Sequence, residues 1–359
     1  MHNQMTSRER FIAAVARRPT DVLPVAPFML DLAAAHAGVS IGEFAIDGRV
    51  MAQAQLALHR EVQQDVIFVG LDNYYIAAGF GCEIDIPDDE IPHLGRPAVD
   101  SLDDVYSLSV PDPHRDGRMP VMLEAIREVR AALGDEIAIR TPGTGPFALA
   151  SYFIGTQQFL VEVGMAEAGL PEANANAIHH ALDLAAEALI AFGKACWDAG
   201  SDLLHCGDSL ASCDMISPHT YVKWAFPYQK KVIEAWKAYG ARTLLHICGN
   251  SSKVLQHYAD TGADIVEIDH KVDLAYAKEA IGDRTCIMGN VDTVSALLLG
   301  TPDDVRQASL ACIEKAGHDG AYVLGSGCMV SRNTPVENVR AMVEVARAQE
   351  NHSWSTAHA

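Results

Sequence analysis

The sequence lacks long apolar runs, including any near its N-terminus. No stretch reaches about eighteen uninterrupted apolar residues, so no membrane-spanning helix is predicted. Residues 1–9 are polar and lead into a predicted helix rather than into the apolar core of a signal peptide. We therefore expect a cytoplasmic protein.

Positive charge is also scarce. The chain has 27 Lys and Arg against 47 Asp and Glu, a formal net charge of −20. Such a surface repels phosphate backbones and anionic lipid headgroups, so we expect no nucleic-acid partner and no membrane association. Eight cysteines in a long cytosolic chain indicate reduced thiols or metal ligands rather than disulfides.

Motifs for nucleotide binding and for two hydrolase classes are absent. The glycine-rich turns at 143–145 and 325–327 carry no P-loop lysine. Gly79-Phe80-Gly81 is followed by Ile84, where a dinucleotide fingerprint needs a glycine. Neither G-x-S-x-G nor H-E-x-x-H occurs. Nothing therefore indicates a nucleotide cofactor.

Eight short apolar segments recur along the chain of 359 residues, and most alternate with helical patterns. This alternation indicates a parallel sheet, and eight strands predict an α/β fold of the (β/α)8 TIM-barrel type. An open doubly wound sheet is the competing geometry. We expect one barrel domain over 1–350, with an N-terminal helical extension, and a flexible tail over 351–359. The predicted strands are Leu23–Pro27, Asp65–Gly70, Ile137–Thr141, Asp202–Cys206, Arg242–Cys248, Asp264–Asp269, Thr285–Gly289 and Ala321–Gly325.

Helix boundaries are marked by capping residues and glycines. Thr6 with Glu9, and Thr334 with Glu337, have the spacing of a capping box. Three further helical patterns stop just before a glycine, the usual helix terminator. The region 71–116 is irregular and suggests a hairpin near 79–87. The three helical patterns that stop before a glycine cover residues 171–199, 218–239 and 251–261.

Polar residues and sulfur ligands gather at the predicted C-terminal ends of the strands, where barrel enzymes place their active sites. His246 and Cys248 lie two residues apart on one strand, so their side chains share a face, and Leu244 on that face points into the barrel. Cys328 follows the eighth strand at the same rim. Three N and S ligands with an open fourth position are typical of catalytic zinc. The alternative is that all three are ordinary core residues.

A rival cluster is weaker, because His205 and Cys206 are adjacent on a strand and point to opposite faces, with Cys213 nearby. Asp269 ends the sixth strand and is our candidate catalytic residue. Two functional roles are open for Asp269: it supplies the fourth metal ligand when substrate is absent, or it orients one of the other ligands. The alternative is a solvated carboxylate at the rim or a helix cap. Three more rim residues, Asp208, Asn290 and Asp292, are candidates for substrate binding, with helix capping equally open for the two aspartates.

With these motifs in place, the chain resembles the uroporphyrinogen decarboxylase superfamily over nearly its whole length. The resemblance rests on four segments, 7–11, 21–25, 141–147 and 288–293. The decarboxylases carry an arginine-rich segment after the first strand, where this chain reads Phe28–Ala34 without arginine. His246-x-Cys248 and Cys328 are similar instead to the zinc motif of the methylcobamide:coenzyme M methyltransferases, the corrinoid branch of this superfamily.

The resemblance implies a zinc-dependent methyl transfer between a corrinoid and a thiol. The corrinoid, a cobalamin, is expected on a separate corrinoid protein, because no Asp-x-His-x-x-Gly cobalamin signature occurs here. Coenzyme M, another thiol or tetrahydrofolate is the expected acceptor, and the physiological direction stays open. Three alternatives remain: a decarboxylase-like lyase, a cobalamin-independent methyltransferase of the methionine-synthase type, and a non-enzymatic barrel with structural zinc.

Overall fold

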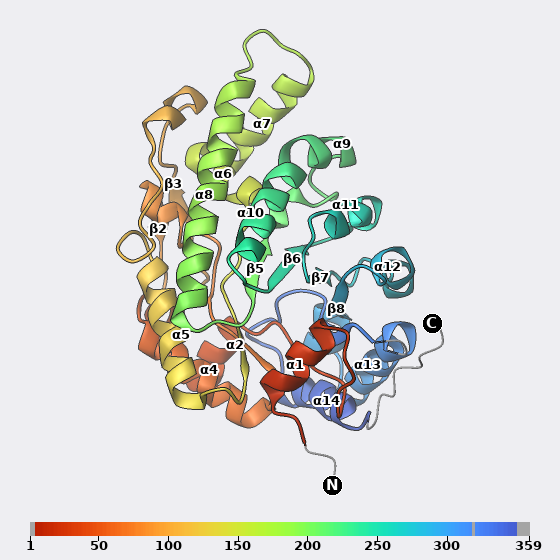
Figure 1. Ribbon diagram of the computed structural model, residues 1–359. Helices are drawn as coiled ribbons and strands as arrows, with labels where there is room; N and C mark the ends of the chain where they lie inside the picture. The colour runs from red at the N-terminus through yellow and green to blue at the C-terminus, as the bar shows by residue number, and fades with distance from the viewer. Residues whose placement is uncertain (1–3, 318–319, 350–359) are drawn as a thin grey trace.

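The chain is seen in a computed structural model that describes residues 4–317 and 320–349; the predicted tail 351–359 lies outside them. Figure 1 shows helices arranged around a central group of strands. Across the described residues, no helix is long and apolar enough to cross a bilayer.

The strands are short. They are β1 (Val66–Phe68), β2 (Glu83–Asp85), β3 (His93–Arg96), β4 (Ala138–Arg140), β5 (Leu204–Gly207), β6 (Thr243–Ile247), β7 (Ile265–Ile268), β8 (Cys286–Val291) and β9 (Tyr322–Ser326).

The helices precede, follow and separate these strands. The α-helices are α1 (Ser7–Val15), α2 (Asp31–Ala37), α3 (Ile41–Ile46), α4 (Gly48–Val62), α5 (Met119–Leu133), α6 (Pro146–Ile154), α7 (Thr156–Glu167), α8 (Ala175–Ala199), α9 (Pro218–Thr220), α10 (Phe226–Ala238), α11 (Leu255–Asp260), α12 (Leu274–Ile281), α13 (Pro302–Ala316) and α14 (Val336–Arg347). Short 3-10 turns are η1 (Ala77–Phe80), η2 (Leu102–Ser107), η3 (Ser209–Ala211) and η5 (Ser252–Val254), and π-turns are η4 (Tyr221–Ala225) and η6 (Thr293–Leu298).

Parallel pairing joins the strands into a closed ring. β1 pairs with β4, and β5 to β9 pair in sequence order. A bridge between Arg140 and Leu203 connects the two sheets. Val25 closes the ring, because it bridges Leu324 in β9 and accepts a hydrogen bond from the amide of Asp65 at 2.9 Å. The barrel prediction is confirmed, and the open sheet is excluded.

The first predicted strand is reduced to this bridge. Pro24 and Pro27 flank its centre, and proline has no amide hydrogen to donate to a neighbouring strand. The irregular region 71–116 contains a hairpin outside the barrel, formed by β2 and β3. Its second strand lies beyond the predicted range 79–87.

Helix prediction succeeded best where a cap was clear. Thr6 and Glu9 form both bonds of the capping box of α1. The second predicted box is wrong, because Pro335 caps α14 and the hydroxyl of buried Thr334 has no partner. The predicted helix 218–239 is interrupted by a π-turn just before Pro227, whose ring cannot donate the next helical bond.

The N-terminal helix α1 closes one end of the barrel. Phe11 and Ala14 of α1 pack with inward-facing residues of the strands, among them Val66, Leu244 and Ile265. Leu244 therefore points into the barrel, as predicted. Because side chains alternate along a strand, His246 and Glu267 also face inward, two residues nearer the opposite end.

Candidate metal centre

Three predicted ligands meet at the C-terminal rim of the barrel. His246 lies in β6, Cys248 follows β6 directly, and Cys328 follows β9. Their ligand atoms all lie within 4.8 Å of one another. His246 Nε2 is 3.2 Å from Cys248 Sγ and 3.9 Å from Cys328 Sγ, and the two sulfurs are 3.4 Å apart.

These distances fit a tetrahedral metal. For Zn–S near 2.3 Å and Zn–N near 2.0–2.1 Å, the tetrahedral edges are about 3.8 Å between two sulfurs and about 3.6 Å between nitrogen and sulfur. The nitrogen–sulfur separations of 3.2 and 3.9 Å lie on either side of their value, and the sulfur–sulfur separation of 3.4 Å is slightly shorter than its value. Because the donors are soft, they favour zinc over magnesium or calcium.

The orientation of His246 also suits a metal ligand. Its Nδ1 lies 3.1 Å from the carbonyl oxygen of Glu267 and 3.3 Å from Glu267 Oε2. A proton on Nδ1 satisfies these acceptors and leaves Nε2 facing the sulfurs. A partner of this kind fixes the tautomer of a metal-binding histidine.

The three ligand side chains lie so close together that each changes the pKa of the others. A hydrogen bond from Cys328, together with His246, outweighs burial and lowers the pKa of Cys248 to about 4. The same shared proton raises the pKa of Cys328. Burial lowers the pKa of His246, but the Cys248 thiolate and Glu267 outweigh it and raise it to about 9. At neutral pH without metal, the Cys248 thiolate therefore faces a protonated His246, and a metal ion that binds here would displace the proton from Nε2 of His246.

A buried ion pair, which no sequence pattern predicted, lies behind the cluster inside the barrel. Arg140 binds both oxygens of Glu267 at 2.7 and 2.6 Å. Its guanidinium lies 4.5 Å from the ring centre of Phe28 and 4.8 Å from that of Phe68. The available signal was a single charged residue within each of two buried segments, IAIRT and IVEI.

Asp269 lies close behind the cluster. Its Oδ2 accepts a hydrogen bond from the amide of Gly249 at 2.8 Å, and its Oδ1 accepts one from the amide of Lys271 at 3.0 Å. It is buried but is not one of the three clustered ligands. In this position it holds the loop that follows Cys248, and its catalytic role stays a prediction.

The three predicted substrate-binding residues do not line the pocket at the cluster. Asp208 is fully buried and accepts bonds from the amides of Phe147 and Ala148 at the start of α6, and burial raises its pKa to about 6. Asn290 donates to the carbonyls of Asp269 and Val272. Asp292 caps η6, as the capping alternative predicted.

In the rival cluster, His205 and Cys206 point to opposite faces of β5, as expected. His205 lines the pocket, whereas Cys206 lies in the hydrophobic core. Burial and Arg140 lower the pKa of His205 well below its usual value, so its ring is neutral. A Cβ at Gly143 would fall 2.0 Å from His205 Nδ1, so only glycine lets this loop lie against the imidazole.

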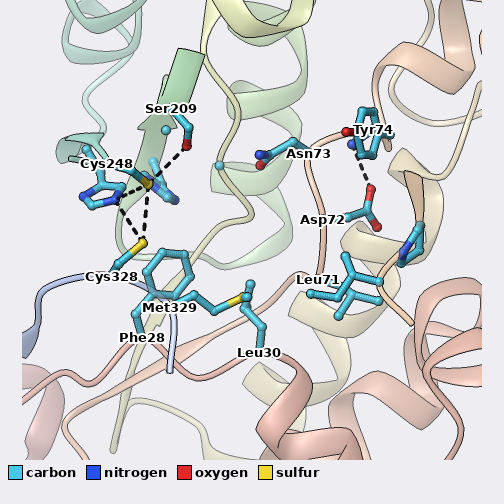
Figure 2. Close-up of a pocket in the computed structure, with 16 residues that line it drawn as sticks. Phe28, Leu30, Leu71, Asp72, Asn73, Tyr74, Ser209, Cys248, Cys328 and Met329 are labelled. Carbon is cyan, nitrogen blue, oxygen red and sulfur yellow. Dashed lines mark hydrogen bonds between the residues drawn. The ribbon is translucent and has the colours of Figure 1, made fainter. Parts of the chain in front are cut away.

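The metal cluster opens into a cavity of about 430 Å³. Figure 2 shows the sulfurs at one end and Leu71, Asp72 and Tyr74 at the other. Ser209 Oγ lies 3.3 Å from Cys248 Sγ. The far wall comes from the irregular region that sequence patterns did not place. The sixteen lining residues are Phe28, Leu30, Leu71, Asp72, Asn73, Tyr74, Ile91, Pro92, Gly143, His205, Gly207, Ser209, His246, Cys248, Cys328 and Met329.

A closed α/β barrel with three soft ligands at the mouth of an apolar cavity defines a candidate metalloenzyme of the barrel class. Comparison with known proteins identifies the family. Residues 6–349 match uroporphyrinogen decarboxylase (URO-D), and the chain belongs to this family.

Relatives with two different activities match this chain. A methylcobamide:CoM methyltransferase of Methanosarcina acetivorans is 30% identical, over 96% of this chain and 98% of its own. A uroporphyrinogen decarboxylase of Microcystis aeruginosa is 29% identical, over 80% of each chain. The structure of a methyltransferase from Methanosarcina mazei superposes with a TM-score of 0.85 at 28% identity, over 96% of this chain and 99% of that one.

Proposed function

We propose that this chain is a zinc-dependent methyltransferase. It moves a methyl group between a methylated cobalamin, carried by a separate corrinoid protein, and a small thiol. The observation that carries the proposal is the His246, Cys248 and Cys328 cluster, which lies at one end of an apolar cavity. Similarity to methylcobamide:CoM methyltransferases over nearly the whole chain supports it. Tetrahydrofolate is the alternative acceptor, and the cytoplasm, where thiols stay reduced, is the expected location.

Each residue of the site has a separate task in this proposal. His246, Cys248 and Cys328 hold the metal, and Glu267 keeps Nε2 of His246 turned toward it. Asp269 fixes the loop after Cys248. When bound, zinc would hold a substrate thiol as its thiolate at neutral pH. The apolar walls exclude water from the reacting atoms.

The transfer itself is a displacement at the methyl carbon. The lone pair of the substrate sulfur forms the S–C bond as the Co–C bond breaks. The pair of electrons of the Co–C bond stays on cobalt, so Co(III) becomes Co(I). The thiol proton leaves to solvent before the transfer.

The first test joins metal content to turnover. We expect about one zinc per chain by elemental analysis, for a single site of this ligand set. Incubation with methylcobalamin and a panel of thiols should produce Co(I), detected by its absorption spectrum. Chelated protein is the control and should be inactive. A protein without zinc and without thiol-dependent demethylation would contradict the proposal and would favour the decarboxylase-like lyase.

A further inference from the structure

The end of the cavity opposite the metal ligands determines which thiol can enter. In Figure 2, Cys248, Cys328 and Ser209 lie on one side, Asp72 and Tyr74 lie on the other, and Asn73 lies between them. A thiol whose sulfur approaches Cys248 and Cys328 must place the rest of its structure toward this far wall. The charge of that wall therefore selects the head group.

The far wall offers no free cation. Among the described residues, the sixteen that line the cavity include neither lysine nor arginine. Its one carboxylate, Asp72, is bound at both oxygens by Arg118, at 2.6 and 2.8 Å. The other buried guanidinium near the cavity belongs to Arg140, which is bound to Glu267.

The remaining walls are largely apolar. Phe28, Leu30, Leu71, Ile91 and Met329 contribute side chains to the cavity. An anion moved from water into such surroundings loses its hydration, and only a paired charge or several donors would restore that loss. A neutral head group carries no such penalty.

The guanidinium of a neighbouring surface groove is already engaged elsewhere. Arg332 lies in an adjoining surface groove that shares Ile91 with the cavity. It donates to the carbonyl oxygen of Asp89, and Asp31 and Glu90 line the same groove. The carboxylates of this groove offset the charge of Arg332 and disfavour an anion there.

We propose that the thiol used by this protein is uncharged apart from its sulfur and has a small apolar body. The proposal rests on the methyl transfer proposed above and narrows its substrate. The proposed substrate differs from CoM, the thiol in the name of the methylcobamide:CoM methyltransferases that this chain resembles. Coenzyme M, 2-mercaptoethanesulfonate, carries a sulfonate two carbons from its sulfur, and this negative charge would meet no lysine or arginine among the described residues that line the cavity.

Two thiols of equal chain length test the proposal on the zinc-loaded full chain. We expect 2-mercaptoethanol to bind at least about tenfold more tightly than 2-mercaptoethanesulfonate, because the buried anion stays unpaired. Calorimetry without corrinoid measures binding, and demethylation of methylcobalamin measures turnover. The preference should persist at high salt, since screening removes the repulsion of the acidic surface but not the cost of burial.

A charge added to the far wall should reverse the selection. Asn73 is half-buried in a loop and lines the cavity, so Asn73→Lys places an ammonium there without entering the core. We expect it to shift the ratio of the two dissociation constants toward the sulfonate by about tenfold, the effect of a new charge pair. Asn73→Gln is the matched uncharged control and should leave the ratio unchanged.

The outcomes separate the two proposals. Tighter binding of the sulfonate by the unaltered protein would overturn the inference, and methyl transfer to it would leave the proposed function standing. The expected binding preference without methyl transfer to either thiol would support the inference and overturn the proposed function. An unchanged ratio in Asn73→Lys would show that the head group does not reach this wall and would also overturn the inference.

Discussion

At the scale of single residues, the question is what distinguishes His246 from a buried core histidine. A core imidazole needs partners for its polar atoms, and Glu267 supplies one at Nδ1. The other nitrogen faces two cysteine sulfurs from the ends of different strands, a set of donors that binds zinc well. The choice of partners for the two nitrogens therefore favours the metal site over core packing.

Removal of one sulfur tests this assignment most directly. We expect Cys248→Ala to lose zinc and methyl transfer while the barrel stays folded, because Cys248 belongs to the rim and not to the core cluster. Elemental analysis and far-UV circular dichroism measure the two effects. Cys213→Ala, outside the three-ligand cluster, is the control and should keep its zinc. Normal zinc content in Cys248→Ala would show the ligand assignment to be wrong.

The carboxylate of Glu267 forms an ion pair with Arg140 and also lies against Nδ1 of His246. Glu267→Gln keeps the shape but removes the charge opposite Arg140, so the free energy of unfolding should fall by about 3 kcal/mol. Zinc affinity should fall about 10- to 100-fold, since Nδ1 of His246 keeps the backbone carbonyl of Glu267 but loses the negative charge of its carboxylate. Urea unfolding and competition with a chelator measure these quantities.

The same experiment separates positioning from simple stability. Exposed Glu279→Gln on α12 is the control and should change neither quantity. If Glu267→Gln lowered stability but bound zinc as tightly as the unaltered protein, Glu267 would be only the partner of Arg140, without a role in the metal site.

At the scale of elements, the alternation of strand residues explains which features were predictable. The strand ends identified His246, Cys248 and Cys328 because a period of two and a shared rim suffice to bring them together. The pairing of Arg140 with Glu267 joins residues 127 positions apart. It depends on where β4 and β7 lie around the ring, which no local pattern gives.

The loops limited prediction for a different reason. The far wall of the cavity comes from residues after β1 and from the β2–β3 hairpin, which lack a strong periodic pattern. Rim polarity also made Asp208, Asn290 and Asp292 candidates for substrate binding; none of them lines this cavity, and that role stays a prediction. A polar residue after a strand caps a helix as readily as it binds a substrate.

The docking of α1 gives a prediction with a defined pH dependence. Arg10 of α1 binds Asp21 Oδ1 at 2.7 Å, and the side chain of Asp21 is 19% exposed. Burial raises the pKa of Asp21, but Arg10 outweighs it and the pKa lies below its usual value. A lowered pKa means that the stabilisation is present above the unfolded-state pKa of about 3.9 and is lost as the pH falls through the folded value.

We therefore expect Asp21→Asn to lower the free energy of unfolding by about 1 kcal/mol at neutral pH, a partly buried ion pair being worth slightly more than an exposed one. The difference from the unaltered protein should shrink as the pH falls below about 4. Urea unfolding across this range measures it. Asp303→Asn, which breaks an exposed pair with Arg306, should have almost no effect at any pH. A difference that grew on acidification would contradict the sign of the shift.

At the scale of the whole molecule, the barrel and the metal site are largely separate structures. The ring closes because the amide of Asp65 donates to the carbonyl of Val25, and the residues on either side of Val25 share backbone hydrogen bonds with Leu324. Helix α1 fills one end of the ring with Phe11. The ligands come from the ends of β6 and β9, at the other end. Closure of the barrel was predictable from the eight apolar segments and their alternation with helices. The shortness of the first strand was not, because Pro24 and Pro27 reduce it to a single bridge.

This separation predicts how the protein responds to loss of metal. A structural zinc contributes folding free energy outright, and proteins that depend on it unfold in a chelator. Here the apolar core is continuous without the cluster, so the chelated chain should keep its far-UV circular dichroism and a cooperative thermal transition. Its Tm should fall, because any ligand that binds only the folded state stabilises it.

Added zinc should restore both the Tm and the methyl transfer, and magnesium should restore neither, because thiolate ligands bind it poorly. Loss of the circular dichroism signal on chelation would instead make the metal structural and remove the reason to place catalysis at this rim. Retention of the fold with loss of transfer would mean that the barrel supplies the shape of the site and the three ligands supply its chemistry. Substitutions at the rim would then change the reaction while the stability of the barrel stayed nearly constant.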